Sequence, residues 1–283
     1  TRLTGRYMDF VLYPFSFREY LEYLGFKPDF YLTESVANTK NHLSDYIKKG
    51  GFPEALKIGE RFLLRLYDDI INKDILARYG VRYIKALKEL GKFVLSNFSS
   101  EISYNSLREF LKVKSVHTVK NYLGYLENAY LVFLIEKFSY SIKDRTKAPR
   151  KIYLVDTGIG NLGFRFTEDK GKFIENLVAI ELKREKEKNP LLEIYDWKSY
   201  SGKEVDFVLK EDRKILSLLQ VSYDITNPKT RGREISALLK ASAELKCKNL
   251  ILINWDYEGK EEIKGEKIHF LPLWKWLLNH GVR

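Results

Sequence analysis

The sequence predicts a multidomain α/β protein, and three observations support this fold class. The 283 residues exceed the size of one average domain. Hydrophobic residues make up 45% of the chain, which is enough apolar surface to fill more than one core. Helical periodicity dominates the first half, whereas strand-like and helix-like stretches alternate from residue 151 onward. We therefore expect three regions, 1–80, 81–150 and 151–283.

Residues 1–80 are expected to hold one short strand at 7–13 and then helices. Ser16 is placed to cap a helix over 17–24, because a serine hydroxyl can accept a backbone N–H of the first turn. A helical stretch over 43–49 ends at Gly50 and Gly51, a pair typical of a helix stop. Pro53 then starts a segment that runs to residue 75.

Residues 81–150 predict a winged helix-turn-helix, because two helices separated by a short turn are followed by a strand. The expected helices cover 84–98, 103–111 and 115–129, the strand covers 131–138, and a polar loop covers 139–149. Ser115 is an N-cap candidate for the third helix, whose inward face carries the apolar stripe Val116, Val119, Leu123 and Leu126.

The opposite face of that helix and the following loop carry side chains suited to DNA. Between Arg108 and Arg150 there are nine Lys or Arg residues and four Asp or Glu residues. The whole chain has a net charge of +11, which also favours a polyanionic partner. We predict DNA contacts from Lys114, His117, Thr118, Lys120, Asn121, Tyr125, Lys143, Arg145, Lys147 and Arg150. The alternative is a structural spacer with a solvated basic loop.

Residues 151–283 predict an α/β domain with a central mixed sheet. Strands are expected at 152–155, 193–197, 204–209, 217–222 and 249–254, and helices at 172–186 and 233–245. Glu204 and Asp206 share one strand face, and Gln220 and Ser222 share a face of the next strand. With Glu175 on the preceding helix, this is the plan of the PD-(D/E)XK nuclease fold, the fold of restriction endonucleases.

The chain resembles, nearly end to end, the C-terminal portion of a family of archaeal and bacterial AAA ATPases that carry a nuclease-like domain of unknown function. The resemblance is carried by Thr4-Gly-Arg-Tyr7, Tyr13-Pro-Phe-Ser-Phe-Arg-Glu19, Gly50-Gly-Phe-Pro-Glu54, Lys151-Ile-Tyr-Leu-Val-Asp-Thr-Gly158, Glu175-Asn176, Glu204-Val-Asp-Phe207 and Gln220-Val-Ser222. It implies that residues 1 to about 30 are the tail of an ATPase core and that a helical lid follows. It also implies an N-terminal ATPase domain as partner, and ATP and Mg²⁺ in the parent protein. Arg6 is a candidate for contact with ATP in trans in the intact protein, and the alternative is a surface or salt-bridged arginine.

The sequence departs from the nuclease pattern at two positions. Gln220 offers a neutral carbonyl where a carboxylate is expected, and Ser222 stands where the pattern has lysine. Lys203 is expected to face away from Asp206. Glu175, Asp206 and Gln220 therefore predict a degenerate, inactive site with no bound metal beyond low-affinity Mg²⁺ at Asp206. No Gly-x-x-x-x-Gly-Lys-Ser/Thr motif is present, so we expect no cofactor in this chain itself.

Gly158-Ile-Gly-Asn-Leu-Gly163 matches a dinucleotide-binding fingerprint, but the polar stretch that follows favours a surface turn.

The single Cys247 excludes an internal disulfide and no apolar run is long enough to span a membrane, which favours a cytoplasmic location. A Lys- and Glu-rich chain with one Met and one Cys is typical of thermophiles. The start at Thr1 indicates a fragment.

These observations leave three functions open. The first is DNA binding or partner docking by the C-terminal part of an ATPase, with self-association to a homo-oligomer as a further expectation. The second is a metal-dependent DNA nuclease that uses Glu175, Asp206 and Gln220. The third is a pure protein-interaction module.

Overall fold

The N-terminal part of the chain is helical in the computed structural model, which describes residues 10–163 and 169–279. Its helices are α1 (Phe17–Tyr23), α2 (Thr33–Lys49), α3 (Pro53–Ile58), α4 (Glu60–Asp69) and the π-helix η1 (Ile70–Leu76). Ser16 caps α1 in a reciprocal capping box with Glu19, as expected. The strand predicted at 7–13 is wrong for 10–13, which form neither strand nor helix; 7–9 lie outside the described residues.

The middle region follows the predicted order of helices with two additions. It contains α5 (Ile84–Ser96), β1 (Ser100–Ile102), α6 (Tyr104–Phe110), α7 (Val116–Asn128), β2 (Val132–Lys137), α8 (Ile142–Lys147) and β3 (Arg150–Leu154). Ser103 and Ser115 cap α6 and α7 through their hydroxyls. The predicted loop at 139–149 holds the short helix α8, because the Ser141 hydroxyl accepts the N–H of Asp144 and starts a turn.

The C-terminal region alternates helices and strands, as the sequence predicts. Its elements are α9 (Thr157–Gly160), α10 (Lys170–Lys188), β4 (Leu192–Lys198), β5 (Glu204–Glu211), β6 (Lys214–Val221), α11 (Pro228–Leu245), β7 (Leu250–Asn254), β8 (Gly259–Ile263), β9 (Glu266–Pro272) and α12 (Leu273–Asn279). The surface turn expected at 158–163 is wrong at its start, because residues 157–160 form the buried helix α9.

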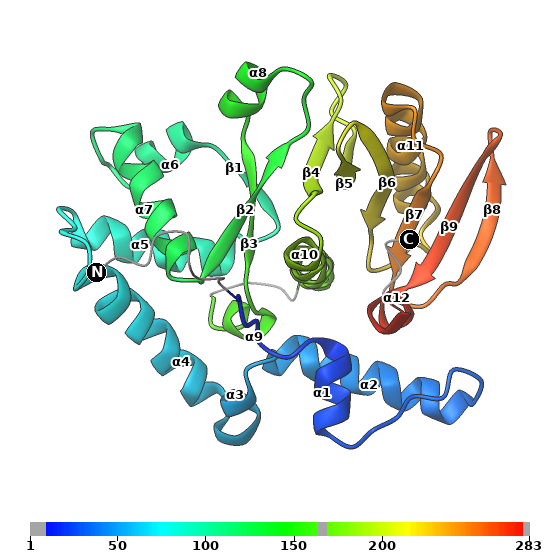
Figure 1. Ribbon diagram of the computed structural model, residues 1–283, viewed down its shortest axis with the longest axis horizontal. Coiled ribbons are helices and arrows are strands. Elements are labelled where there is room, and N and C mark those ends of the chain that lie inside the picture. Colours follow the sequence, from blue (N-terminus) through cyan, green and yellow to red (C-terminus); the bar gives the residue numbers. More distant parts are fainter. Residues whose placement is uncertain (1–9, 164–168, 280–283) are drawn as a thin grey trace.

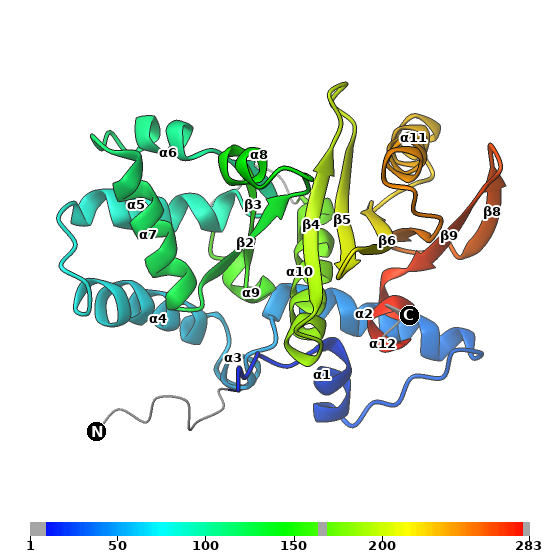
Figure 2. The ribbon, with the colours of Figure 1, turned by 45° about the horizontal axis from the view of Figure 1, so that its top comes forward.

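All nine strands of the described chain form one mixed sheet in the order β1-β3-β2-β4-β5-β6-β7-β9-β8 (Figures 1 and 2). The sheet therefore runs across the expected boundary at 150–151. β1, β3 and β2 pair antiparallel, and β2 joins β4 in parallel at two register positions. The sheet thus consists of a three-stranded part and a six-stranded part with a short connection between them.

Successive residues of the strands pack into separate hydrophobic cores on the two faces of the sheet, because side chains alternate between the faces along a strand. Phe207 and Leu219 pack with α1, α2, α10 and α12 on one face, whereas Val208 and Leu218 pack with α11 on the other. A third core lies between α4 to α7 and the β2–β3 pair. Within the described residues, no helix is both long and apolar enough to cross a lipid bilayer.

Candidate functional site

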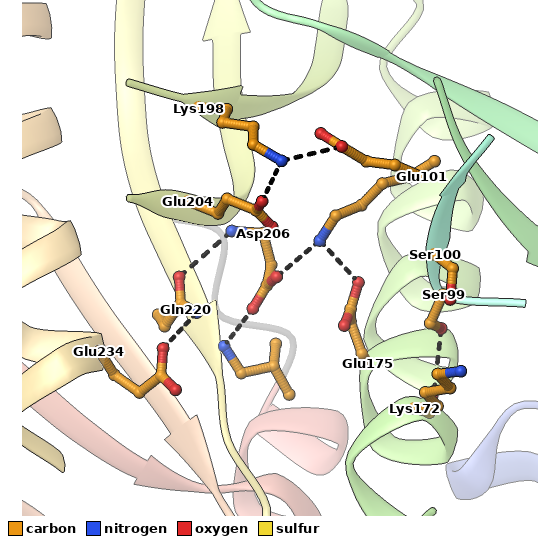
Figure 3. Close-up of polar contacts among 12 residues, drawn as sticks. Ser99, Ser100, Glu101, Lys172, Glu175, Lys198, Glu204, Asp206, Gln220 and Glu234 are labelled. Carbon is orange, nitrogen blue, oxygen red and sulfur yellow. Dashed lines mark hydrogen bonds and ion pairs between the residues drawn. The ribbon is translucent and has the colours of Figure 1, made fainter. Parts of the chain in front are cut away.

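A polar cleft of about 660 Å³ lies between the two parts of the sheet. Its walls carry side chains from β1, β3 and α10 on one side and from β5, β6 and α11 on the other (Figure 3). Glu175, Asp206 and Gln220, the residues predicted for a nuclease-like site, all line it (Figure 3). The structure thus brings together three side chains from three different elements.

The pairing of β5 with β6 explains why Asp206 and Gln220 meet. Phe207 pairs with Leu219 in this antiparallel ladder, so Asp206 lies opposite Gln220. The backbone N–H of Asp206 donates to Gln220 Oε1 at 3.3 Å, and the N–H of Val221 donates to Asp206 Oδ2 at 2.9 Å. Each of the two side chains therefore accepts a backbone N–H from the opposite strand, and both side chains are buried.

Lys151 is the member of the cleft that sequence reasoning missed. Its ammonium donates to Asp206 Oδ1 at 2.7 Å and to Glu175 Oε1 at 3.0 Å, and the residue is 5% exposed. Burial works against the charged ammonium, but the carboxylates of Asp206 and Glu175 outweigh it and hold the pKa of Lys151 well above its ordinary value. The available signal was a lysine directly before the apolar stretch 152–155.

The acidic side of this cluster carries more negative charge than one ammonium balances. Burial, followed by the nearby charge of Asp206, raises the pKa of Glu175 above its ordinary value. The Tyr153 hydroxyl, on the same strand face as Lys151, donates to Glu175 Oε1 at 2.8 Å. Glu175 is thus held by two side chains of β3.

The remaining polar side chains of the cleft bind one another. Gln220 Nε2 donates to Glu234 Oε2 at 2.8 Å, and Arg233 donates to the other oxygen of Glu234 at 2.6 Å. Lys203, expected to face away, lines the cleft because it precedes β5 and does not follow strand parity. Its ammonium donates to the Ser236 hydroxyl. Ser222, at the position of the nuclease lysine, is not among the lining residues.

A metal site of the usual composition is not formed by the described side chains. Across 10–163 and 169–279, no group of three or more His, Cys, Asp and Glu side chains is placed to hold a metal ion. Glu204, which points toward the cleft, instead pairs with Lys198, and Lys198 also pairs with Glu101 at 2.9 Å (Figure 3).

The predicted DNA-contacting helix, α7, exposes part of the face that the sequence indicated. Lys114, just before the helix, and His117, Lys120 and Asn121 on it are exposed, whereas Thr118 is half-buried. Tyr125 stacks on Tyr79, with ring centroids 4.0 Å apart, so its ring face is already covered.

The predicted wing is divided between exposed lysines and paired arginines. Lys143 and Lys147 are exposed on α8. Arg150 donates to Glu136 at 2.7 Å, and Arg145 lies 3.5 Å from the same carboxylate. The pairing follows from the β2–β3 register, in which Glu136 stands opposite Arg150.

The ring of Tyr104 connects α7 with the base of the wing. Lys120 Nζ lies 5.1 Å from the ring centroid and the Arg150 guanidinium lies 5.8 Å from it, both at cation–π distance. Lys120 of α7 and Arg150 of β3 therefore lie against the same aromatic ring. We call Lys114, Lys120, Lys143 and Lys147, with the two paired arginines, the basic surface.

A third polar cluster joins two of the stretches that carry the family resemblance. Asp156, which is 3% exposed, accepts the N–H of Gly51 at 2.6 Å, of Gly158 at 2.8 Å and of Ile159 at 3.3 Å. Burial raises the pKa of Asp156 to about 6, although these three N–H donors act in the opposite direction. The cluster therefore ties the α2–α3 turn to α9. Arg6, predicted to contact ATP, lies outside the described residues.

Two family models match successive parts of the chain. Residues 40–170 match a domain of unknown function (DUF8612), and residues 170–276 match another domain of unknown function (DUF4143). The second is a domain found in proteins associated with AAA ATPases. The two matches meet at the first residue of α10.

Relatives occur in an archaeon and a bacterium. An uncharacterized protein of Methanocaldococcus jannaschii is 36% identical over 99% of this chain and 65% of its own length. An uncharacterized protein of Haemophilus influenzae is 28% identical over 97% of this chain and 66% of its own length. The chain thus spans just under two thirds of each of these relatives. No solved structure matches it.

Proposed function

We propose that this chain binds double-stranded DNA through the basic surface, as part of a protein that also contains an AAA ATPase module. Two findings support the ATPase partner. Residues 170–276 match a domain that occurs in proteins associated with AAA ATPases, and about a third of each relative lies outside the part that this chain matches. Self-association belongs to the same proposal, because ATPases of this class act on nucleotides held between subunits.

The order and pairing of the middle elements support a winged helix-turn-helix. Helix α5 is followed by β1, the α6–α7 pair and the antiparallel strands β2 and β3, with α8 in the connection between these strands. In this arrangement α7 is the helix that enters a major groove and α8 lies where a wing meets the phosphate backbone.

The observation that carries the DNA proposal is the Tyr104 contact with both Lys120 and Arg150. It places Lys120 of α7 beside Arg150, at the end of the connection that carries α8, and we expect a duplex on α7 to reach Lys143 and Lys147 as well. Lysine contacts to phosphate release bound counterions, and the resulting affinity falls steeply with salt. The neutralised Arg145 and Arg150 are expected to position Tyr104 and β2 rather than bind phosphate.

The test is DNA binding by a variant with Lys114, Lys143 and Lys147 changed to Glu. We expect it to bind a short random-sequence duplex more weakly at low salt, with the salt slope reduced by about 0.9 for each lost phosphate contact. The matched control reverses three exposed lysines elsewhere, Lys57, Lys260 and Lys264, with the same change in net charge.

Equal binding by the two triple variants would show that net charge alone attracts DNA. Absence of salt-dependent binding by the unmodified chain would favour the protein-interaction module.

Metal-dependent DNA cleavage is the second candidate, and a specific observation favours it. Glu175, Asp206 and Gln220 converge on a cleft that also holds an ammonium, that of Lys151. A lysine beside paired carboxylates is suited to stabilising an attacking hydroxide. Incubation of the chain with single- and double-stranded DNA in Mg²⁺ or Mn²⁺ tests it. Cleavage that Asp206→Asn abolishes would establish a nuclease; we expect none.

A further inference from the structure

The ammonium of Lys151 occupies the point between the two carboxylates where a cation would be bound. It lies within 3.0 Å of Glu175 Oε1 and of Asp206 Oδ1, and the side chain is almost fully buried. β3 supplies this lysine from the opposite side of the cleft to β5, so the ammonium is tethered to the protein and cannot diffuse away.

We propose that Lys151 is a resident cation that replaces a divalent metal ion and closes this cleft to Mg²⁺ and Mn²⁺. This inference rests on the proposed function and deepens it, since it gives a physical reason why we expect no DNA cleavage at this cleft. It assigns Lys151 a positioning role: the ammonium keeps the two acidic side chains together without supplying Lewis-acid chemistry.

The carboxylate oxygens nearest Lys151 are those that a metal ion would need. Mg²⁺ binds oxygen ligands at about 2.1 Å and holds a near-octahedral shell, so it cannot share the position with an ammonium. A metal would have to separate the buried ammonium from Glu175 and Asp206, its two ion-pair partners in the described chain, while Asp196 is a further buried carboxylate close enough to feel its charge. Loss of both ion pairs of a buried charge is unfavourable.

Two further oxygen atoms of the cleft are held in place by backbone N–H groups. Asp206 Oδ2 accepts the Val221 N–H, and Gln220 Oε1 accepts the Asp206 N–H. The orientation of the Gln220 amide follows from its partners, because an N–H can only donate and the Glu234 carboxylate can only accept. Gln220 is therefore fixed as a bridge between β5 and α11, and it contributes a neutral carbonyl where a metal site would gain from a carboxylate.

The test is Mn²⁺ binding, followed by electron paramagnetic resonance on the unmodified chain and on Lys151→Ala, Asp206→Asn and the double variant. We expect the unmodified chain and Asp206→Asn to bind Mn²⁺ equally poorly. Removal of the ammonium leaves two paired carboxylates without a counter-ion, so Lys151→Ala is expected to gain affinity by about tenfold or more. The double variant is expected to lose that gain.

Mn²⁺ binding by the unmodified chain that depends on Asp206 would overturn the inference, and so would a folded Lys151→Ala protein without any gain. Lys151→Met, which keeps the length of the side chain, is the second variant in case alanine prevents folding.

A measurement on the unmodified protein needs no variant. The ¹⁵N resonance of the Lys151 ammonium is expected to keep its position and width when Mn²⁺ is added, and selective broadening would contradict the proposal. DNA binding by Lys151→Ala separates the two hypotheses, because the basic surface is intact in this variant. Failure of the unmodified chain to bind DNA would refute the proposed function and leave the cation assignment standing.

Discussion

Replacement of Gly50 by alanine is expected to destabilise the protein far more than replacement of Gly59. Both glycines end a helix, and their backbone angles are similar: φ is 78° and ψ is −174° at Gly50, and φ is 86° and ψ is −162° at Gly59. This conformation is almost restricted to glycine, and another residue there costs about 1–3 kcal/mol. The two substitutions therefore share the same backbone penalty.

The surroundings of the two glycines differ. A Cβ on Gly50 would lie 2.1 Å from Asp156 Oδ1, whereas a Cβ on Gly59 would meet no atom within 4 Å. The carboxylate of Asp156 must then move away from the N–H groups of Gly51, Gly158 and Ile159. A buried donor without an acceptor costs about 1–3 kcal/mol, so Gly50→Ala is expected to exceed Gly59→Ala by about 3 kcal/mol or more.

Urea unfolding followed by tryptophan fluorescence measures this difference, provided that the slope with denaturant is unchanged. Asp156→Ala supplies the control, because Gly50→Ala made in that background has no carboxylate to displace and is expected to cost no more than Gly59→Ala. Equal midpoints for Gly50→Ala and Gly59→Ala in the unmodified background would refute this account of the cluster.

Two further substitutions test the packing around the cleft. Asn176→Leu is expected to destabilise by about 2–4 kcal/mol in urea unfolding, because the buried Asn176 amide binds both the N–H and the carbonyl of Leu154 and both would be left unpaired; a loss below that of an exposed control, Asn121→Leu, would contradict this role. Burial raises the pKa of Asp196 from 3.8 to about 7, and its Oδ1 has no hydrogen-bond partner in the described chain. The unfolded chain therefore loses this proton near pH 4 and the folded protein near pH 7, so the free energy of unfolding falls as pH rises between these values. Asp196→Asn is therefore expected to match the unmodified protein near pH 4 and to exceed its stability at pH 8 by a few kcal/mol, at about 1.4 kcal/mol per pKa unit; a difference that does not change with pH would count against this.

Local signals in the sequence predicted most of the helices and the pairing of Asp206 with Gln220 in the cleft. Ser16 and Ser115 mark true helix starts, because capping depends on residues within one turn. Strand parity and the order of the strands were enough to bring Asp206 and Gln220 together, because they lie on neighbouring strands of an antiparallel pair.

Contacts between distant segments were not predictable in the same way. Lys151 reaches Asp206 only because the three-stranded part of the sheet packs beside the six-stranded part, a contact between residues 55 positions apart. The pairing of Arg150 with Glu136 depends on the register between β2 and β3. The sequence does not determine this register, because it depends on the conformation of the connection between the two strands. Long-range packing thus pairs Arg145 and Arg150, two of the predicted DNA contacts, with Glu136.

The short connection between β2 and β4 gives the sheet a seam. The backbone ladder across it spans two register positions, and Lys151 fastens the same two parts together from the side of the cleft. A force that separates the three-stranded part from the six-stranded part would therefore act on the β2–β4 ladder and on the Lys151 ion pairs together. Rotation of one part against the other would change the distance between Lys151 and the two carboxylates of the cleft.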